Sequence, residues 1–171
     1  MYDKIVIFSP TFKTQYDILW HKISSEGVTV HENLSEIVLS RIYTDQLANP
    51  EVKSLIISDD EDEQWRKGID SRLVNKIMTN SRHCNLSFIF LSQKLTQLPT
   101  VVRSQLDCLC VFAASSFLEL DSLWKECSTL PKKQFMEIFA NVTSKPFHFL
   151  AICTVQGKLK LFDCLVEEII V

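Results

Sequence analysis

The stretch Lys53-Ser54-Leu55-Ile56-Ile57-Ser58-Asp59-Asp60 decides the fold of this 171-residue chain. Its three consecutive aliphatic residues, bounded by polar ones, are typical of a strand buried in an α/β sheet. Asp59 and Asp60 follow at the carboxyl end, the edge of an open parallel sheet where ligands bind. In phosphate-handling proteins an acid there holds Mg²⁺, and a second acid positions the attacking water. Many strands also end in Asp at an ordinary turn, so the pattern alone leaves both interpretations open.

Apolar runs of strand length alternate with amphipathic helical patterns along the chain. The expected strands are residues 5–8, 55–60, 86–91 and 108–112. The expected helices are residues 16–27, 33–48, 70–83, 99–103, 116–127 and 132–141. Two last strands, 147–153 and 158–162, are separated by Gln156-Gly157, which predicts a hairpin. This order predicts an α/β fold in one domain, residues 1–171, with a mostly parallel sheet, covered on both faces and finished by an antiparallel hairpin.

Capping residues indicate where several helices begin. Asn33 with Glu36, and Ser116 with Glu119, have the spacing of a capping box, and Asp70 is the expected cap of the third helix. For the helix that begins at Asn33, the predicted apolar stripe consists of Leu34, Ile37, Val38 and Ile42.

Composition bounds the class of protein. Apolar residues make up 46%, with only 3 Gly and 5 Pro, which argues against a disordered chain. The net charge is −3, so the overall charge does not indicate nucleic-acid binding. A local basic patch or the pore of an oligomer can still bind nucleic acid. The apolar runs are far shorter than the roughly 18 residues that span a bilayer. We therefore expect a soluble protein with no membrane span and no signal peptide.

The cysteines and histidines show no metal-binding pattern. The six cysteines, none in a CxxC pair, are Cys84, Cys108, Cys110, Cys127, Cys153 and Cys164. Most lie in apolar runs, where a reduced thiol behaves as a small hydrophobic group, so we expect reduced thiols in a reducing compartment inside the cell. The four histidines lack an i, i+4 partner or a nearby Cys at ligand spacing, and no zinc site is predicted.

Three expected strands end in polar residues that can share one edge of the sheet. These residues are Ser9 and Thr11, Asp59 and Asp60, and Ser92 and Gln93. Because the carboxyl ends of parallel strands lie side by side, the six side chains can converge on one ligand, with Ser9 and Thr11 as candidates for binding a cofactor. The alternative is that strand ends are polar simply because they enter solvent.

Four segments, in this order, resemble a known family. They are residues 5–11 (IVIFSPT), 55–60 (LIISDD), 80–93 (NSRHCNLSFIFLSQ) and 98–107 (LPTVVRSQLD). Together they resemble the DNA-packaging ATPases of large DNA viruses, virophages and Polinton-like elements, in the FtsK/HerA branch of P-loop ATPases. The resemblance covers about residues 5 to 155, and its most specific part is an Arg-His pair followed by a strand ending in Gln. It implies a three-layer RecA-like fold of the ASCE P-loop NTPase type.

The resemblance also implies roles for individual residues. Asp59 matches the Walker B acid that binds Mg²⁺, and Asp60 matches the neighbouring acid that polarises water. Gln93 matches the sensor of the γ-phosphate. Arg103 is a candidate arginine finger, since a fixed guanidinium supplied to a neighbouring subunit's nucleotide stabilises charge on the transferred phosphoryl group. An ordinary solvated arginine is the alternative for Arg103.

Arg82 and His83 are weaker candidates. They can contact DNA phosphates or relay a signal between sites. The alternative is two cations favourably placed at a helix C-terminus.

One departure from the family concerns the phosphates. A P-loop ATPase cradles them with the motif GxxxxGK[ST], and this chain has none. In the family the motif precedes the strand matching residues 5–8, so we expect the missing β–P-loop–α unit before Met1. Family sheets run 5-1-4-3-2, and strand 1 lies between the strands matching residues 88–91 and 108–112. We predict that these two strands pair directly in the isolated chain.

The resemblance implies an enzyme that hydrolyses ATP with Mg²⁺ in a ring, usually a hexamer. It would drive double-stranded DNA into a capsid, with capsid proteins as partners, in the host cytoplasm or nucleus or in the virion. For this chain alone we expect weak or absent ATP binding. The alternatives are a non-catalytic remnant that serves as an interaction or DNA-binding module, and a metal-dependent nuclease, since paired acids also bind two metals.

Overall fold

The structure, a computed structural model, describes residues 1–12, 27–113 and 116–170. It divides into two compact units, Met1–Gln105 and Leu106–Val171. The helix expected over residues 16–27 lies almost entirely outside the described residues, and the single domain stays a prediction.

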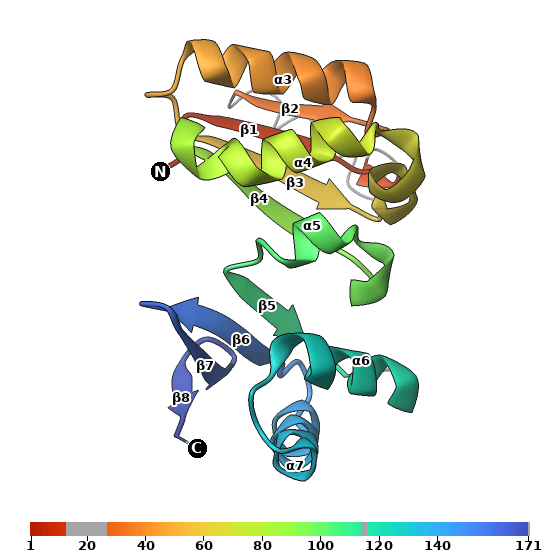
Figure 1. The fold of residues 1–171 in the computed structure, drawn as a ribbon, viewed down its shortest axis with the longest axis vertical. Coiled ribbons are helices and arrows are strands. Elements are labelled where there is room, and N and C mark those ends of the chain that lie inside the picture. Colours follow the sequence, from red (N-terminus) through yellow and green to blue (C-terminus); the bar gives the residue numbers. More distant parts are fainter. Residues whose placement is uncertain (13–26, 114–115, 171) are drawn as a thin grey trace. The chain divides into compact units, whose positions relative to one another are not determined.

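A parallel sheet of order β2-β1-β3-β4 forms the centre of the first unit (Figure 1). Its strands are β1 (Lys4–Phe8), β2 (Val28–His31), β3 (Ser54–Asp59) and β4 (Leu86–Leu91). The register places Phe8 opposite Ser58, and Asp59 opposite Leu91. Three of these strands were predicted, whereas β2 was not. The polar ends of β1, β3 and β4 therefore share one edge.

Helices and short helical turns connect and cover these strands. They are α3 (Glu36–Ala48), the π-helical turn η1 (Gln64–Gly68), α4 (Ser71–Asn80), the 3₁₀ turns η2 (Ser81–Cys84) and η3 (Leu95–Gln97), and α5 (Thr100–Arg103). Val6, Phe8 and Ile56 of the sheet share one buried cluster with Leu39 of α3 and Ile77 of α4. This cluster is the core of the first unit.

The predicted start of α3 is wrong by two residues. Ser35 is the cap, and its hydroxyl accepts a hydrogen bond from the Val38 amide at 3.3 Å. Leu34 precedes the helix and, with Leu39 at the fourth helical position, belongs to the core, which is the arrangement of a hydrophobic staple. Ile37, assigned to the apolar stripe, is 82% exposed. The buried face consists of Leu39, Ile42, Tyr43 and Gln46.

The predicted cap of α4 is confirmed, since the Asp70 carboxylate accepts from the Arg72 amide at 2.8 Å. The predicted cap of α6 (Phe117–Cys127) is confirmed as well, since the Ser116 hydroxyl accepts from the Glu119 amide at 3.2 Å. In both cases a short polar side chain satisfies an amide in the first turn that has no partner within the helix.

The second unit contains an antiparallel sheet of order β5-β6-β7-β8. Its elements are β5 (Cys108–Val111), α6 (Phe117–Cys127), α7 (Lys132–Thr143), β6 (Leu150–Val155), β7 (Lys158–Asp163) and β8 (Glu167–Ile169). Gln156 and Gly157 both have positive φ, 52° and 74°, as a type I′ turn requires. The predicted hairpin is confirmed, and β8 is an additional strand.

The strands at 86–91 and 108–112 were predicted to pair directly. β4 belongs to the first unit and β5 to the second, so this pairing stays a prediction. Within the second unit, β5 pairs with β6, so one side of its backbone is satisfied there.

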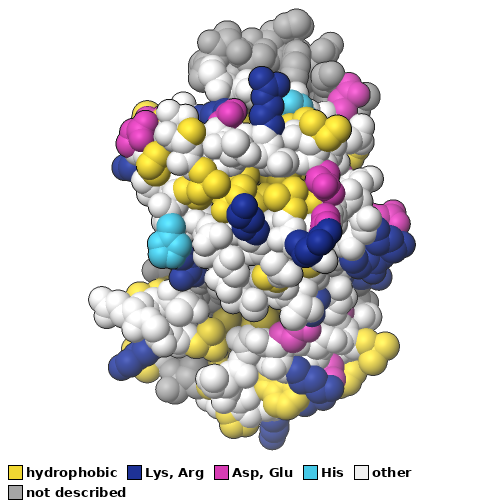
Figure 2. All heavy atoms as spheres, turned by 45° about the horizontal axis from the view of Figure 1, so that its top comes forward, with side chains coloured by type: hydrophobic (Ala, Val, Ile, Leu, Met, Phe, Trp, Pro, Cys, Tyr) yellow, Lys and Arg dark blue, Asp and Glu magenta, His cyan; other side chains and the backbone are white. Residues whose placement is uncertain are grey.

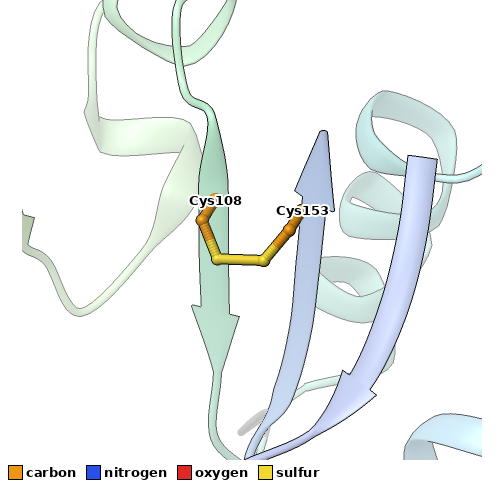
Figure 3. The surroundings of a disulfide bond; sticks show 2 residues. All are labelled: Cys108 and Cys153. Atoms are coloured by element: carbon orange, nitrogen blue, oxygen red, sulfur yellow. A yellow bond between two sulfur atoms is a disulfide. The ribbon is translucent and has the colours of Figure 1, made fainter. Parts of the chain in front are cut away.

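Cys108 and Cys153 form a disulfide between β5 and β6 (Figure 3). The two residues are direct partners in the antiparallel register, with their Cα atoms 4.1 Å apart. The expectation of six reduced thiols is therefore wrong for this pair. The sequence does not reveal the pair, because strand register and not sequence spacing brings the two cysteines together. The other four cysteines, Cys84, Cys110, Cys127 and Cys164, lie outside this disulfide.

The surface carries both signs of charge. On the face that Figure 2 presents, Lys and Arg side chains are interspersed with Asp and Glu. Among the described helices, none combines the length and the apolar character needed to cross a membrane.

Candidate active site at the carboxyl edge of the parallel sheet

Ser9 and Asp59 meet at the carboxyl ends of β1 and β3. Because Phe8 lies opposite Ser58, the next residue of each strand is a neighbour across the sheet. The Ser9 hydroxyl donates a hydrogen bond to Asp59 Oδ2 at 2.8 Å, and Ser9 is only 1% exposed. A hydrogen bond to a charged carboxylate is among the stronger ones in proteins. The structure thus brings two of the predicted site residues into direct contact.

Asp60 follows in a left-handed backbone conformation, with φ of 54°. Asp tolerates this conformation better than most residues. Its amide donates to the Leu91 carbonyl at 3.2 Å, which ties the end of β3 to β4. The Gln93 side-chain amide donates to Asp60 Oδ1 at 3.5 Å, a long hydrogen bond between two exposed side chains. A second predicted pair is therefore adjacent, although loosely held.

The acidic loop after Asp60 takes part in the site. Glu61 is buried and accepts a hydrogen bond from the Leu34 amide at 2.9 Å. Burial raises the pKa of the Glu61 carboxyl, which the Leu34 amide partly offsets and the charge of Asp59 reinforces.

Asp62 is the second member of this loop. It accepts a hydrogen bond from the Ser92 hydroxyl at 2.6 Å. Burial raises its pKa, the Ser92 hydrogen bond lowers it, and the charge of Asp60 raises it further. Sequence reasoning missed these contacts. The only signal was the run of acids itself.

Trp65 of η1 anchors the loop to the sheet. Its side chain is 1% exposed, and its indole N–H donates to the Ser58 hydroxyl at 2.8 Å. The ring packs edge-on against Phe88 and Phe90, with centroids 6.2 and 5.3 Å away. The Trp65 amide also donates to the Glu61 carbonyl at 3.1 Å. Trp65 thus fixes the backbone that follows the two acids.

A polar cavity of about 360 Å³ lies at this edge. Its lining residues are Asp60, Asp62, Glu63, Arg66, Gln93 and Gln97. Three carboxylates and two side-chain amides supply the hard oxygen donors that Mg²⁺ prefers. The guanidinium of Arg66 is the group suited to a bound anion. The cavity can therefore accommodate a cation together with a negatively charged ligand.

The other predicted site residues lie elsewhere or are engaged locally. Arg103 is half-buried, and its guanidinium donates to the Leu98 and Thr96 carbonyls at 2.8 and 3.3 Å. Thr11 is half-buried, two residues after Ser9. The roles of Arg103 and Thr11 stay predictions.

Arg82 and His83 are exposed in η2, directly before β4. They therefore lie at the opposite end of that strand from Gln93. The structure does not bring these two cations together with the acids, and their position after α4 is that of cations at a helix C-terminus.

The fold is that of a viral DNA-packaging ATPase. The structure is similar to B204, the DNA-packaging ATPase from Sulfolobus turreted icosahedral virus, with a TM-score of 0.65 and 16% identity over 94% of this chain and 82% of that chain. It is also similar to the genome packaging NTPase B204 from Sulfolobus turreted icosahedral virus 2. In complex with AMPPCP, that protein gives a TM-score of 0.65 and 17% identity over 94% and 81% of the two chains. In complex with AMP, the same protein gives a TM-score of 0.59 and 16% identity, over 94% of this chain and 96% of that chain.

The family membership of the chain follows from its sequence. Residues 2–155 match the poxvirus A32 protein family, and the chain belongs to it. Among curated proteins, none matches the chain.

Proposed function

We propose that this chain is the core of a viral genome-packaging ATPase, which uses ATP hydrolysis to drive double-stranded DNA into a capsid. One observation carries the proposal: the contacts Ser9–Asp59 and Asp60–Gln93 gather at the carboxyl edge of the parallel sheet. Ligands of open α/β sheets bind at this edge. Membership of the poxvirus A32 family and the likeness to B204 support the same function.

The acids fit a Mg²⁺ ion. Asp59 offers a carboxylate whose orientation is fixed by the Ser9 hydroxyl, and Mg²⁺ is commonly bound by one or two carboxylates together with phosphate oxygens. When bound, the ion neutralises negative charge on the phosphates. Asp60 orients the attacking water and accepts its proton, and Gln93 lies beside it, within a long hydrogen bond of Asp60 Oδ1.

The fit to ATP itself is incomplete in this chain. The 171 residues contain no GxxxxGK[ST], so no Gly-rich loop and Lys cradle a triphosphate. No step is therefore assigned to such a loop, and we expect the 171-residue chain to bind ATP weakly. Arg66, in the cavity, is the group of this chain placed to contact a phosphate there.

The remaining features of the FtsK/HerA resemblance belong to the proposal. They are a homo-oligomeric ring, usually a hexamer, with Arg103 reaching the neighbouring subunit's nucleotide, and capsid proteins as partners. Arg82 and His83, exposed at the end of the sheet away from the acids, would contact DNA phosphates or relay between sites. The site of action would be the infected host's cytoplasm or nucleus, or the virion.

The test is Mg²⁺-dependent ATP hydrolysis with and without double-stranded DNA, on the 171-residue chain and on any longer form that its gene encodes. Asp60→Asn should lower kcat by about 100-fold or more, the usual contribution of a positioned general base. Asp45→Asn, an exposed acid of α3, is the matched control and should leave the rate unchanged.

Equal hydrolysis by wild type and Asp60→Asn would contradict the assignment of the site. DNA binding without hydrolysis in every form would favour a non-catalytic DNA-binding module. Mg²⁺-dependent DNA cleavage that Asp60→Asn abolishes would indicate a nuclease.

A further inference from the structure

His148, Asp163 and Cys164 form a cluster in the second unit, whereas the residues assigned to the ATPase belong to the first. One ligand atom from each, an imidazole nitrogen, a carboxylate oxygen and a thiol sulfur, lies within 4.8 Å of the other two. We propose that these three side chains bind one Zn²⁺ ion, with water in the fourth position.

The pairing of β6 and β7 creates this cluster. Asp163 is the last residue of β7 and lies opposite Leu150, near the start of β6. The Cys164 amide donates to the Phe149 carbonyl at 3.1 Å, so the turn after β7 is tied to the residue after His148. The His148 amide in turn donates to the Lys145 carbonyl at 3.2 Å. Both segments that carry ligands are thus held by backbone hydrogen bonds before any metal arrives, which favours binding.

The donor set matches zinc. Zn²⁺ binds imidazole, carboxylate and thiolate at about 2.0–2.3 Å in tetrahedral sites, so neighbouring ligand atoms end up about 3.5 Å apart. Starting from within 4.8 Å, the side chains need to move by about an ångström or less. A soft thiolate ligand selects zinc over Mg²⁺, which prefers oxygen ligands only. The site would therefore discriminate against the ion proposed for Asp59.

The backbone around the ligands is strained. Phe147, directly before His148, has φ of 64°, and Cys164 and Leu165 have φ of 54° and 61°. Non-glycine residues seldom adopt this left-handed conformation, and such strain concentrates at functional sites. Neither Phe147, which is 94% exposed, nor Leu165, which is 54% exposed, gains burial in return. The left-handed residues Phe147 and Cys164 instead turn the backbone so that His148 and Cys164 lie beside Asp163.

Lys145 competes with a metal for Asp163. Its ammonium lies 3.1 Å from Asp163 Oδ2, while His148 Nδ1 lies 2.6 Å from Oδ1. The Lys145 side chain is 57% exposed and that of Asp163 is 14% exposed, so Lys145 can move into water when an ion arrives. Because the Lys145 ammonium is largely solvated, its ion pair contributes little, and its loss opposes zinc binding only weakly.

The test is zinc titration by calorimetry into the chelator-treated chain, without added thiols and in excess Mg²⁺ to occupy the acids of the first unit. We expect one Zn²⁺ per chain. Co²⁺ substituted for Zn²⁺ should give the visible absorption of a tetrahedral site and a thiolate charge-transfer band.

Variants distinguish zinc binding at His148, Asp163 and Cys164 from zinc binding elsewhere on the chain. His148→Gln and Cys164→Ser should each weaken binding by at least about 10–100-fold, the cost of losing even a group that only supports a ligand. Cys164→Ser should also abolish the charge-transfer band. Cys127→Ser changes another half-buried cysteine of the second unit that lies outside the disulfide. It is the matched control and should bind zinc as wild type does. Lys145→Ala should tighten binding by up to about fivefold, because it removes the competing cation.

Failure to bind zinc in the folded wild-type chain would overturn the proposal. Binding that survives both ligand variants, or a charge-transfer band that survives Cys164→Ser, would overturn it as well. None of these outcomes bears on ATP hydrolysis, which depends on residues of the first unit.

Discussion

The hydrogen bond between Trp65 and Ser58 supports the strand end that carries both acids. Trp65→Phe removes the indole N–H that donates to the Ser58 hydroxyl at 2.8 Å. Ser58 is 2% exposed, so water cannot replace the lost donor. The unsatisfied hydroxyl costs about 1–3 kcal/mol, and the void beside the smaller ring adds about 1 kcal/mol. We expect Trp65→Phe to lower the free energy of unfolding of the first unit by about 2–4 kcal/mol.

Ser58→Ala breaks the same hydrogen bond from the other side. It leaves the buried indole N–H without its acceptor and should cost about 1–3 kcal/mol. The double variant leaves neither polar group unsatisfied. It should therefore be less destabilised than the sum of the single variants by about 1–2 kcal/mol, since removing both partners of a buried hydrogen bond can be nearly neutral.

Urea unfolding should be followed by hydrogen exchange of peptides from β3 and β4, because a protein of two units need not unfold in one transition. Unchanged m-values would confirm that the same surface unfolds in every variant. Costs that add within about 0.5 kcal/mol would refute the coupling and with it the role assigned to this hydrogen bond.

Two further variants test the edge of the sheet. Ser9→Ala removes a hydrogen bond to a carboxylate and should lower the free energy of unfolding, measured in urea, by about 1.5–3 kcal/mol. It should also weaken Mg²⁺ binding measured by calorimetry. An unchanged Mg²⁺ affinity would contradict the role of Ser9 in orienting Asp59. Glu61→Gln keeps an acceptor for the Leu34 amide but cannot ionise. Because burial raises the Glu61 pKa above 4.5, the folded chain holds this proton more tightly than the unfolded chain. Wild type should therefore lose stability relative to Glu61→Gln as the pH rises from 4.5 through the raised pKa, and a pH-independent difference would contradict the assignment.

Long apolar runs made most of the sheet predictable. β3 and β4, each with several consecutive apolar residues, were located nearly to the residue. β2 has the sequence VTVH and β8 the sequence EEI, so neither contains an apolar run that would mark a strand. Their places come from pairing with β1 and β7, which is a property of the assembled sheet. The start of α3 was misplaced for a related reason, since Ser35 and Asn33 are both good caps and tertiary packing of Leu34 decides between them.

Neighbouring strand ends made part of the site predictable. Ser9 and Asp59 follow strands that pair in parallel, so their contact needs only the strand order. The contacts of Asp62 and Trp65 depend on the left-handed turn at Asp60 and on the π-helical turn that follows it. Neither turn has a distinctive local sequence. The Cys108–Cys153 disulfide depends on antiparallel register in the same way.

The two adjacent acids are supported very differently, and this difference suits the two roles proposed for them. Asp59 receives a short hydrogen bond from a buried hydroxyl, so its carboxylate has little freedom. Asp60 is exposed and receives a long hydrogen bond from Gln93. A metal ligand benefits from a fixed carboxylate, because Mg²⁺ demands near-ideal octahedral geometry. A group that accepts a proton from water must be able to approach that water, and catalytic hydrogen bonds are often long until substrate binds. The single-residue step from β3 into the left-handed turn is what places one acid in each environment.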